Sequence, residues 1–198
     1  MKKEQLLNLL ASMAACMEEN RQYLTMLDTE IGDGDHGINM ARGFHAVKES
    51  LPDWSELDMG SILVQVGKTL IREVAGTSGP LYGSAIRCAG KLLGEKEEIT
   101  LADFTQMLGE GIGRIQQLGK ASEGEKNMLD AMLPAYRALA NGGTLKDAEA
   151  AAAAGMIHTK DIVATKGRAS YVGKRSLGHQ DPGATSFTLL LSEIAKVT

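Results

Sequence analysis

The chain has 198 residues, of which 43% are hydrophobic and 23% charged, and its formal net charge is -4. These values are typical of a globular protein with one sizeable core, so we expect a single domain over residues 1–198. The acidic balance and the lack of a basic stripe argue against nucleic-acid binding. Without a signal peptide or a long apolar run, we expect a cytoplasmic protein with no membrane partner. Cys16 and Cys88 are expected to be buried free thiols.

Apolar residues recur at helical spacing along almost the whole chain. This spacing predicts an all-α fold, a bundle or barrel of about eight antiparallel helices. Capping-box signals at Thr100, Ser122 and Thr144 support three of the predicted starts. The sequence contains no sustained alternation of apolar and polar residues, so no strand is predicted. The predicted helices lie near residues 3–27, 38–50, 60–75, 82–94, 101–118, 125–140, 144–164 and 186–197.

The first connection carries three carboxylates, Asp28, Asp33 and Asp35, among flexible glycines. Three such groups in one turn repel each other strongly unless a cation lies among them. Oxygen ligands with a single nearby histidine suit Mg²⁺ or Ca²⁺ better than zinc, and Mg²⁺ commonly fills its shell with water and phosphate oxygens. We therefore predict a magnesium-held phosphate. The alternative is a solvated acidic turn, since Asp and Gly are common in turns.

Three later connections could contact the same ligand. Residues 76–80 combine glycines, hydroxyls and a helix start, which suit an anion, although in isolation a plain capped turn is the favoured interpretation. Residues 166–176 are rich in positively charged side chains, including Arg168. The two interpretations of this segment are a phosphate-binding loop and a solvated basic turn. Residues 178–186 contain a Pro-Gly turn that approaches a planar ligand or only starts the last helix.

Taken together, residues 32–40, 76–83 and 166–184 resemble the nucleotide-binding L subunits of bacterial dihydroxyacetone kinases, in the same order and over essentially the whole chain. The resemblance implies an eight-helix barrel whose loops at one end bind ADP and two Mg²⁺ ions. It implies that the metals are held by Asp28, Asp33 and Asp35. It places at the nucleotide His36, Gly37, Ile38, Asn39, Thr77, Ser78, Gly119, Met128, Arg168, Asp181, Pro182 and Gly183.

Within that set, the resemblance implies roles. His36, Thr77, Ser78 and Arg168 would position the phosphates, and no residue is assigned as a catalytic group beyond that. Gly119 and Met128 would flank the adenine, and the turn at 181–183 would close over the nucleotide.

The resemblance also implies a phosphotransferase subunit that relays phosphate through bound ADP to dihydroxyacetone held on a separate K subunit. The first predicted helix starts near Met1 and the last ends near the end of the chain. We therefore expect the free-subunit branch, in which an M subunit of the phosphotransferase system is the donor. Alternatives left open are an ATP-dependent kinase subunit, a non-catalytic nucleotide sensor that binds a transcription regulator, and a Mg²⁺-stabilised helical scaffold.

Overall fold

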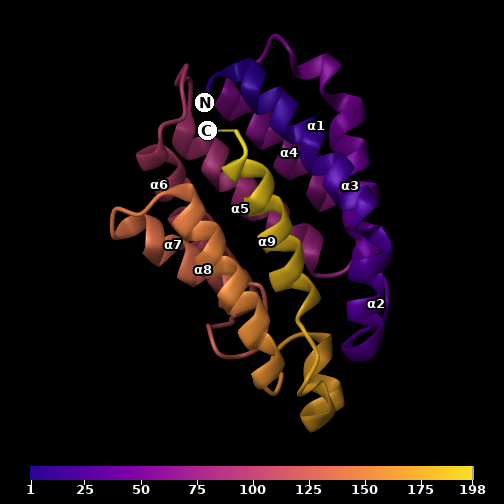
Figure 1. The fold of residues 1–198 in the computed structure, drawn as a ribbon. Coiled ribbons are helices and arrows are strands. Elements are labelled where there is room, and N and C mark those ends of the chain that lie inside the picture. The colour runs from indigo at the N-terminus through magenta and orange to yellow at the C-terminus, as the bar shows by residue number, and fades with distance from the viewer. Residues whose placement is uncertain (198) are drawn as a thin grey trace.

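The computed structural model describes residues 1–197 and contains nine α-helices in that range (Figure 1). These helices explain why apolar residues recur at helical spacing in the sequence. Within residues 1–197 no β-strand is present, so the all-α prediction is confirmed, and none of the helices has the length and apolar content of a membrane span. The α-helices are α1 Lys3–Glu19, α2 Arg21–Ile31, α3 His36–Ser50, α4 Met59–Glu73, α5 Ser78–Leu93, α6 Leu101–Gly119, α7 Leu129–Ala140, α8 Leu145–His158 and α9 Pro182–Ala195. Short 3-10 helices are η1 Pro52–Trp54, η2 Thr159–Asp161 and η3 Arg168–Ser176.

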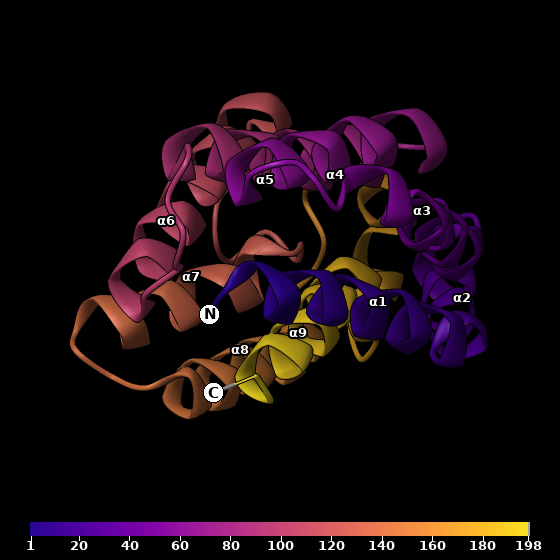
Figure 2. The same ribbon diagram turned by 90° about the horizontal axis from the view of Figure 1, so that it is seen from above.

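The helices close into a ring. In the part of the chain that the structure describes, contacts run from α1 to α3, then in order through α4, α5, α6, α7, α8 and α9, and α9 returns to α1 (Figure 2). The helix α2 continues α1 beyond a break and packs on α3 and α9. Successive helices of the ring run in opposite directions, so the predicted barrel of antiparallel helices is confirmed.

This alternation divides the connections between two poles. Both chain ends lie at the upper pole of Figure 1, and the connections 32–35, 74–77, 120–128 and 159–181 gather at the other, which we call the lower pole. These four connections, together with the helix ends beside them, include all the segments that were predicted to contact a ligand.

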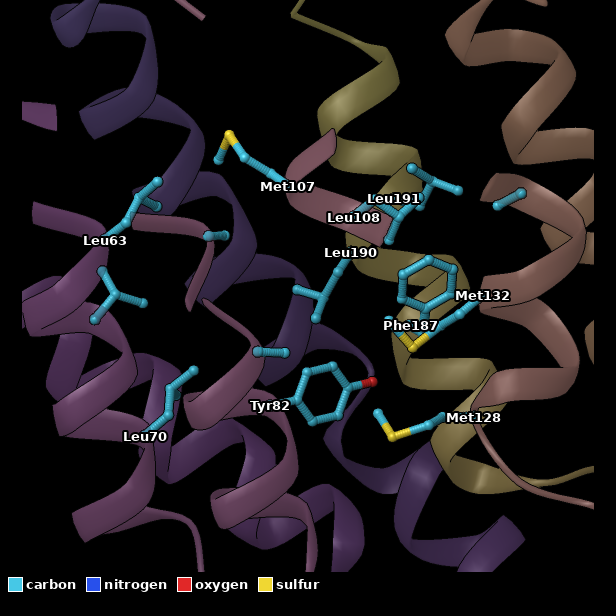
Figure 3. Packing of buried hydrophobic residues seen from close by; sticks show 14 of the residues in the cluster. Leu63, Leu70, Tyr82, Met107, Leu108, Met128, Met132, Phe187, Leu190 and Leu191 are labelled. Atoms are coloured by element: carbon cyan, nitrogen blue, oxygen red, sulfur yellow. The ribbon is translucent and has the colours of Figure 1, made fainter. Parts of the chain in front are cut away.

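Apolar side chains fill the ring. Met17, Phe44 and Leu70 are among the large side chains that are less than 2% exposed. Figure 3 shows the aromatic side chain of Tyr82 among leucine and methionine side chains, with the Tyr82 hydroxyl on the side of Met128. Burying one side chain of this size contributes about 1.5–3 kcal/mol. The core therefore provides a stable frame for the loops of the lower pole.

Glycines allow α4 and α5 to pack backbone against backbone. A Cβ atom added at Gly67 would lie 2.4 Å from the carbonyl oxygen of Gly83, and one added at Gly83 would lie 2.5 Å from the oxygen of Gly67. Gly60 and Gly90 repeat the arrangement, with 2.6 Å in each direction. No real Cβ atom tolerates such distances, so this contact requires glycine on both helices.

We expect Gly83→Ala to lower the free energy of unfolding by about 1–3 kcal/mol, because the added methyl group must push two backbones apart. Gly113→Ala is the matched control, since Gly113 lies in α6 with no atom within 4 Å of an added Cβ. Alanine is favoured over glycine within a helix by about 1 kcal/mol, so the control should be at least as stable as the parent. Urea midpoints measure both effects, and equal losses in the two variants would contradict this explanation.

Several predicted boundaries are wrong for identifiable reasons. The helix predicted over 3–27 is two helices, because the side-chain amide of Asn20 donates to the carbonyl of Cys16 (2.9 Å) and competes with the backbone pattern. The helix predicted from residue 125 begins only at Leu129, since Lys126 has a positive φ of 61°. The Ser122 N–H does bond the Glu125 carboxylate, but no helix follows it.

The helix predicted over 144–164 ends at His158, where the Thr159 hydroxyl donates to the Met156 carbonyl (2.6 Å) and the chain turns into η2. Three other helices begin earlier than predicted: α3 at His36, α5 at Ser78 and α9 at Pro182. Residues predicted as loop are therefore first turns of helices.

Both cysteines are free thiols, as predicted. Cys16 is buried, but Cys88 is only half-buried, because it lies at the margin of the core face of α5.

Candidate functional site

A cavity of about 370 Å³ opens at the lower pole. Its walls come from all four connections of that pole and from the helix ends beside them. Ile115 lines this cavity on one side and the apolar interior of the helix ring on the other. Its side chain is therefore part of the apolar wall between the cavity and the core.

The structure brings most of the predicted site residues together around this one cavity. Gly37 and Ile38 are the exceptions. Gly37 faces α2, where an added Cβ would lie 2.1 Å from the Arg21 carbonyl oxygen, and the side chain of Ile38 is 41% exposed. The predicted residues that line the cavity are Asp28, Asp33, Asp35, His36, Asn39, Thr77, Ser78, Gly119, Met128, Arg168, Asp181, Pro182 and Gly183.

Asp28, Asp33 and Asp35 form a compact carboxylate cluster. One oxygen from each lies within 4.8 Å of the others. Asp28 belongs to the last turn of α2, where the helix end is itself negative, so the cluster is unfavourable without a positive charge. Hard oxygen donors at this spacing fit a divalent cation such as Mg²⁺.

Hydrogen bonds from the start of α3 orient this cluster. Asp28 Oδ2 accepts the backbone N–H groups of Asp35 (2.9 Å) and His36 (3.1 Å). A Cβ at Gly32 would lie 2.1 Å from Asp28 Oδ1, so glycine is required for the chain to turn so tightly over the carboxylate. Arg168 Nη1 lies 3.0 Å from Asp33 Oδ2 and places a guanidinium beside the cluster.

Three helix starts face the same cavity. His36, Ser78 and Pro182 are the first residues of α3, α5 and α9, and each lines the cavity. The first-turn N–H groups of a helix lack intrahelical acceptors and carry partial positive charge, which favours an anion. Residues 76–80 were predicted as a helix start that suits an anion, and residues 178–186 as a turn that approaches a ligand or starts the last helix, whereas a helix start at His36 was not predicted. The cavity thus combines carboxylates that favour a cation with helix starts that favour an anion.

A buried hydrogen-bond chain fixes two of these helix starts to each other. His36 Nδ1 lies 3.2 Å from Ser78 Oγ, His36 Nε2 lies 3.0 Å from Ser186 Oγ, and Ser186 Oγ lies 2.8 Å from the Tyr82 hydroxyl. Burial lowers the pKa of His36, although neighbouring carboxylates raise it, and burial raises the pKa of Tyr82. Tyr82 and Ser186 lie in the segments 76–83 and 178–186 that the sequence analysis singled out, but neither was predicted as a site residue, because nothing in the sequence shows that His36 joins them.

Asp181 caps the start of α9 from a buried position. Its side chain is 7% exposed and accepts the Ala184 N–H at 2.7 Å. Burial raises the pKa of the Asp181 carboxyl to about 6, and the nearby Asp130 carboxylate acts in the same direction.

This shift gives a pH dependence with a defined sign. The pKa of Asp181 is 3.8 ordinarily and about 6 in the fold, so between these values the native state binds more protons than the unfolded state. The contribution of Asp181 to the free energy of unfolding should therefore fall by up to about 3 kcal/mol as pH rises from about 4 to about 6. Asp181→Asn keeps a capping group but does not titrate there. Urea denaturation of both proteins across pH 4–7 measures the difference, and a difference independent of pH would contradict the assignment.

The comparisons with known proteins agree with this picture. The ADP-binding subunit DhaL of a PEP-dependent dihydroxyacetone kinase from Escherichia coli is 38% identical over 98% of this chain and 96% of its own length. The corresponding DhaL subunit of kinase 1 from Listeria innocua is 42% identical over 88% of this chain and 86% of its own length.

A solved structure shares the fold. The dihydroxyacetone kinase from C. freundii, crystallised in complex with AMP-PNP and Mg²⁺, superposes with a TM-score of 0.78 at 24% identity, covering 100% of this chain and 34% of that one. The family model described as DAK2 domain matches residues 30–196. The predicted resemblance is thus confirmed, and the chain belongs to the DAK2 domain family.

Proposed function

We propose that this chain is the ADP-binding phosphoryl-transfer subunit of a phosphoenolpyruvate-dependent dihydroxyacetone kinase, and that residues 1–198 act as one nucleotide-binding domain. The names of the two DhaL relatives, both ADP-binding subunits of phosphoenolpyruvate-dependent dihydroxyacetone kinases, support this assignment, since each matches this chain over most of its length. The observation that carries it is the joint presence, in one cavity, of a carboxylate cluster and three helix starts. A cation-bound diphosphate is the ligand that satisfies both.

In this proposal Asp28, Asp33 and Asp35 hold two Mg²⁺ ions, and ADP is the resident nucleotide. When bound, the metal ions would neutralise the charge of the phosphates, and ADP would carry the transferred phosphoryl group. His36 and Asn39, which line the cavity, would lie beside the phosphates. Gly119 and Met128 would flank the adenine, and the start of α9 at 181–183 would cover the nucleotide.

The protein's contribution to the reaction is alignment and charge. Phosphoryl transfer needs little covalent help from side chains, so positioned donors supply most of the effect. The hydroxyls of Thr77 and Ser78, at the start of α5, would orient the terminal phosphate oxygens. Arg168, whose side chain is 60% exposed at the rim, adds a positive charge where negative charge concentrates during transfer.

The acceptor and the donor come from other chains. We propose that a K subunit presents dihydroxyacetone at the lower pole and that a phosphotransferase-system M subunit recharges the nucleotide there, in the cytoplasm. Both would approach the lower pole, because the residues that line the cavity belong to the connections and helix ends at that end of the ring.

Two measurements test the proposal in sequence. Native mass spectrometry of the purified chain with Mg²⁺ and ADP should show added mass of the nucleotide with metal. The chain is then combined with a K subunit and dihydroxyacetone, and given either the phosphorylated M subunit or ATP. Product with the M subunit supports the proposal, and product with ATP alone favours the ATP-dependent alternative. Retained nucleotide without product from any donor would contradict the transfer role and favour a nucleotide sensor. An absence of bound nucleotide would refute both.

A further inference from the structure

Lys126 is a buried ammonium beside the cavity that no step of the proposed function uses. Its side chain is 1% exposed, and Nζ donates to the carbonyl oxygens of Thr159 (2.7 Å), Ile162 (3.4 Å) and His179. A lysine ammonium has three N–H donors, so all three are engaged by backbone and none is left for a phosphate. Burying an ammonium is costly unless it is fully bonded.

The three carbonyls mark both ends of one segment. Residues 162–179 leave the ring after η2, carry η3 with Arg168, and return shortly before α9. Thr159 and Ile162 lie at the first end, and His179 lies at the second. A single ammonium therefore binds the segment at the two places where it joins the ring.

The backbone around Lys126 is shaped to turn this side chain inward. Lys126 has φ 61°, a left-handed conformation that residues with side chains seldom adopt. The Asp130 carboxylate holds the loop on both sides, accepting the N–H groups of Gly124 (2.5 Å) and Asn127 (2.8 Å). The same loop continues into Met128, which lines the cavity.

We infer that Lys126 is a positioning residue for phosphoryl transfer. It joins the 120–128 loop to both ends of the 162–179 segment and so holds the Arg168 guanidinium beside Asp33. This inference rests on the proposed function for the step that Arg168 serves. Removal of the ammonium leaves the buried Thr159 carbonyl and the partly buried carbonyls of Ile162 and His179 without this donor, so the segment shifts and Arg168 loses its place.

The first test does not depend on activity. Trypsin is added to Lys126→Met and to the control Lys120→Met. Lys120 is an exposed lysine of the same loop, also left-handed at φ 47°, and it does not line the cavity. Cleavage within 162–179, at exposed sites such as Lys174 and Arg175, should accelerate about tenfold or more in Lys126→Met and less than about twofold in the control. Circular dichroism checks that both keep their helices.

The second test separates positioning from general destabilisation. Transfer is measured for Lys126→Met in the parent and in an Arg168→Gln background. If Lys126 acts through Arg168, the substitution lowers kcat about 10- to 100-fold in the parent and less than about twofold in the second background. Lys126→Arg, which keeps the charge and several donors, should recover part of the loss.

Equal losses of kcat in the two backgrounds would overturn the inference, and so would unchanged cleavage of the 162–179 segment. If Lys126→Met does not fold, Lys126→Gln, which keeps two N–H donors, is taken through the same two tests with the same criteria. Proteolysis requires no transfer, so a failure of the proposed function and a failure of this inference give different results.

Discussion

Asp33→Asn is expected to lower phosphoryl transfer about 1000-fold or more and to abolish retention of Mg²⁺ and ADP. The asparagine keeps the size of the side chain but removes one negative charge from a cluster whose oxygens lie within 4.8 Å of one another. A neutral amide oxygen binds a divalent cation weakly, and without the cation the phosphates face the remaining carboxylates of Asp28 and Asp35. Native mass spectrometry measures the ligand, and the coupled assay with the K subunit measures transfer.

The control for that variant is Asp53→Asn. Asp53 is an exposed aspartate in η1, on the connection between α3 and α4, and it does not line the cavity. Circular dichroism should be the same for both variants, because Asp33 is exposed and lies in the connection 32–35, outside every helix of the described chain, and its one ion pair is with the exposed Arg168. If Asp33→Asn still transferred phosphoryl groups at the parent rate and still retained ADP and metal, the assignment of the cluster as the metal site would be refuted.

Arg168→Gln is expected to have two effects of opposite sign. Transfer should fall about 100- to 1000-fold, because a guanidinium that meets the developing charge is lost. In the absence of nucleotide, however, the metal should bind more tightly, since Arg168 Nη1 lies 3.0 Å from Asp33 Oδ2 and competes for that oxygen. Mn²⁺ binding followed by electron paramagnetic resonance measures the second effect, and the coupled assay measures the first.

Arg175→Gln is the matched control for Arg168. Arg175 is an exposed arginine on the same 3-10 segment and does not line the cavity. It should change neither metal affinity nor transfer by more than about twofold, the range expected for an exposed charge. Weaker Mn²⁺ binding by the nucleotide-free Arg168→Gln protein would show that the guanidinium does not compete with the metal.

The sequence predicted the ring because its apolar spacing is local information. Core residues such as Ile62 and Leu70 recur every turn or two, and the structure buries them. The carboxylate cluster was predictable for the same reason, since Asp28, Asp33 and Asp35 are near neighbours in the chain. Three carboxylates so close together repel each other, and this repulsion by itself predicted a bound cation.

The start of α3, and the way the start of α9 is anchored to the rest of the fold, were not predictable, because contacts between distant segments determine them. That residues 178–186 start the last helix was one of the two interpretations that the sequence offered, and the local Asp181 cap agrees with it. Two N–H groups at the start of α3 are satisfied by Asp28, which lies in the preceding helix. The N–H of Asp181, just before α9, bonds the Thr159 hydroxyl at 2.9 Å. No pattern within residues 178–186 contains that acceptor.

Lys126 was missed for a related reason. In the sequence it is a lysine in a polar, glycine-containing stretch, where a solvated charge is the ordinary expectation. Its burial depends on carbonyls 33, 36 and 53 residues further along the chain. Buried polar anchors of this kind become visible only when the fold is known.

The separation of the two poles has a practical consequence for protein engineering. Met1 and Val197 both border a groove at the upper pole, and α3 alone, with 15 residues, spans about 22 Å toward the opposite end. An affinity tag or fluorescent reporter attached at either end would therefore project away from the phosphate-binding loops. Such fusions could be used to immobilise or track the protein while its substrate-facing surface stays accessible.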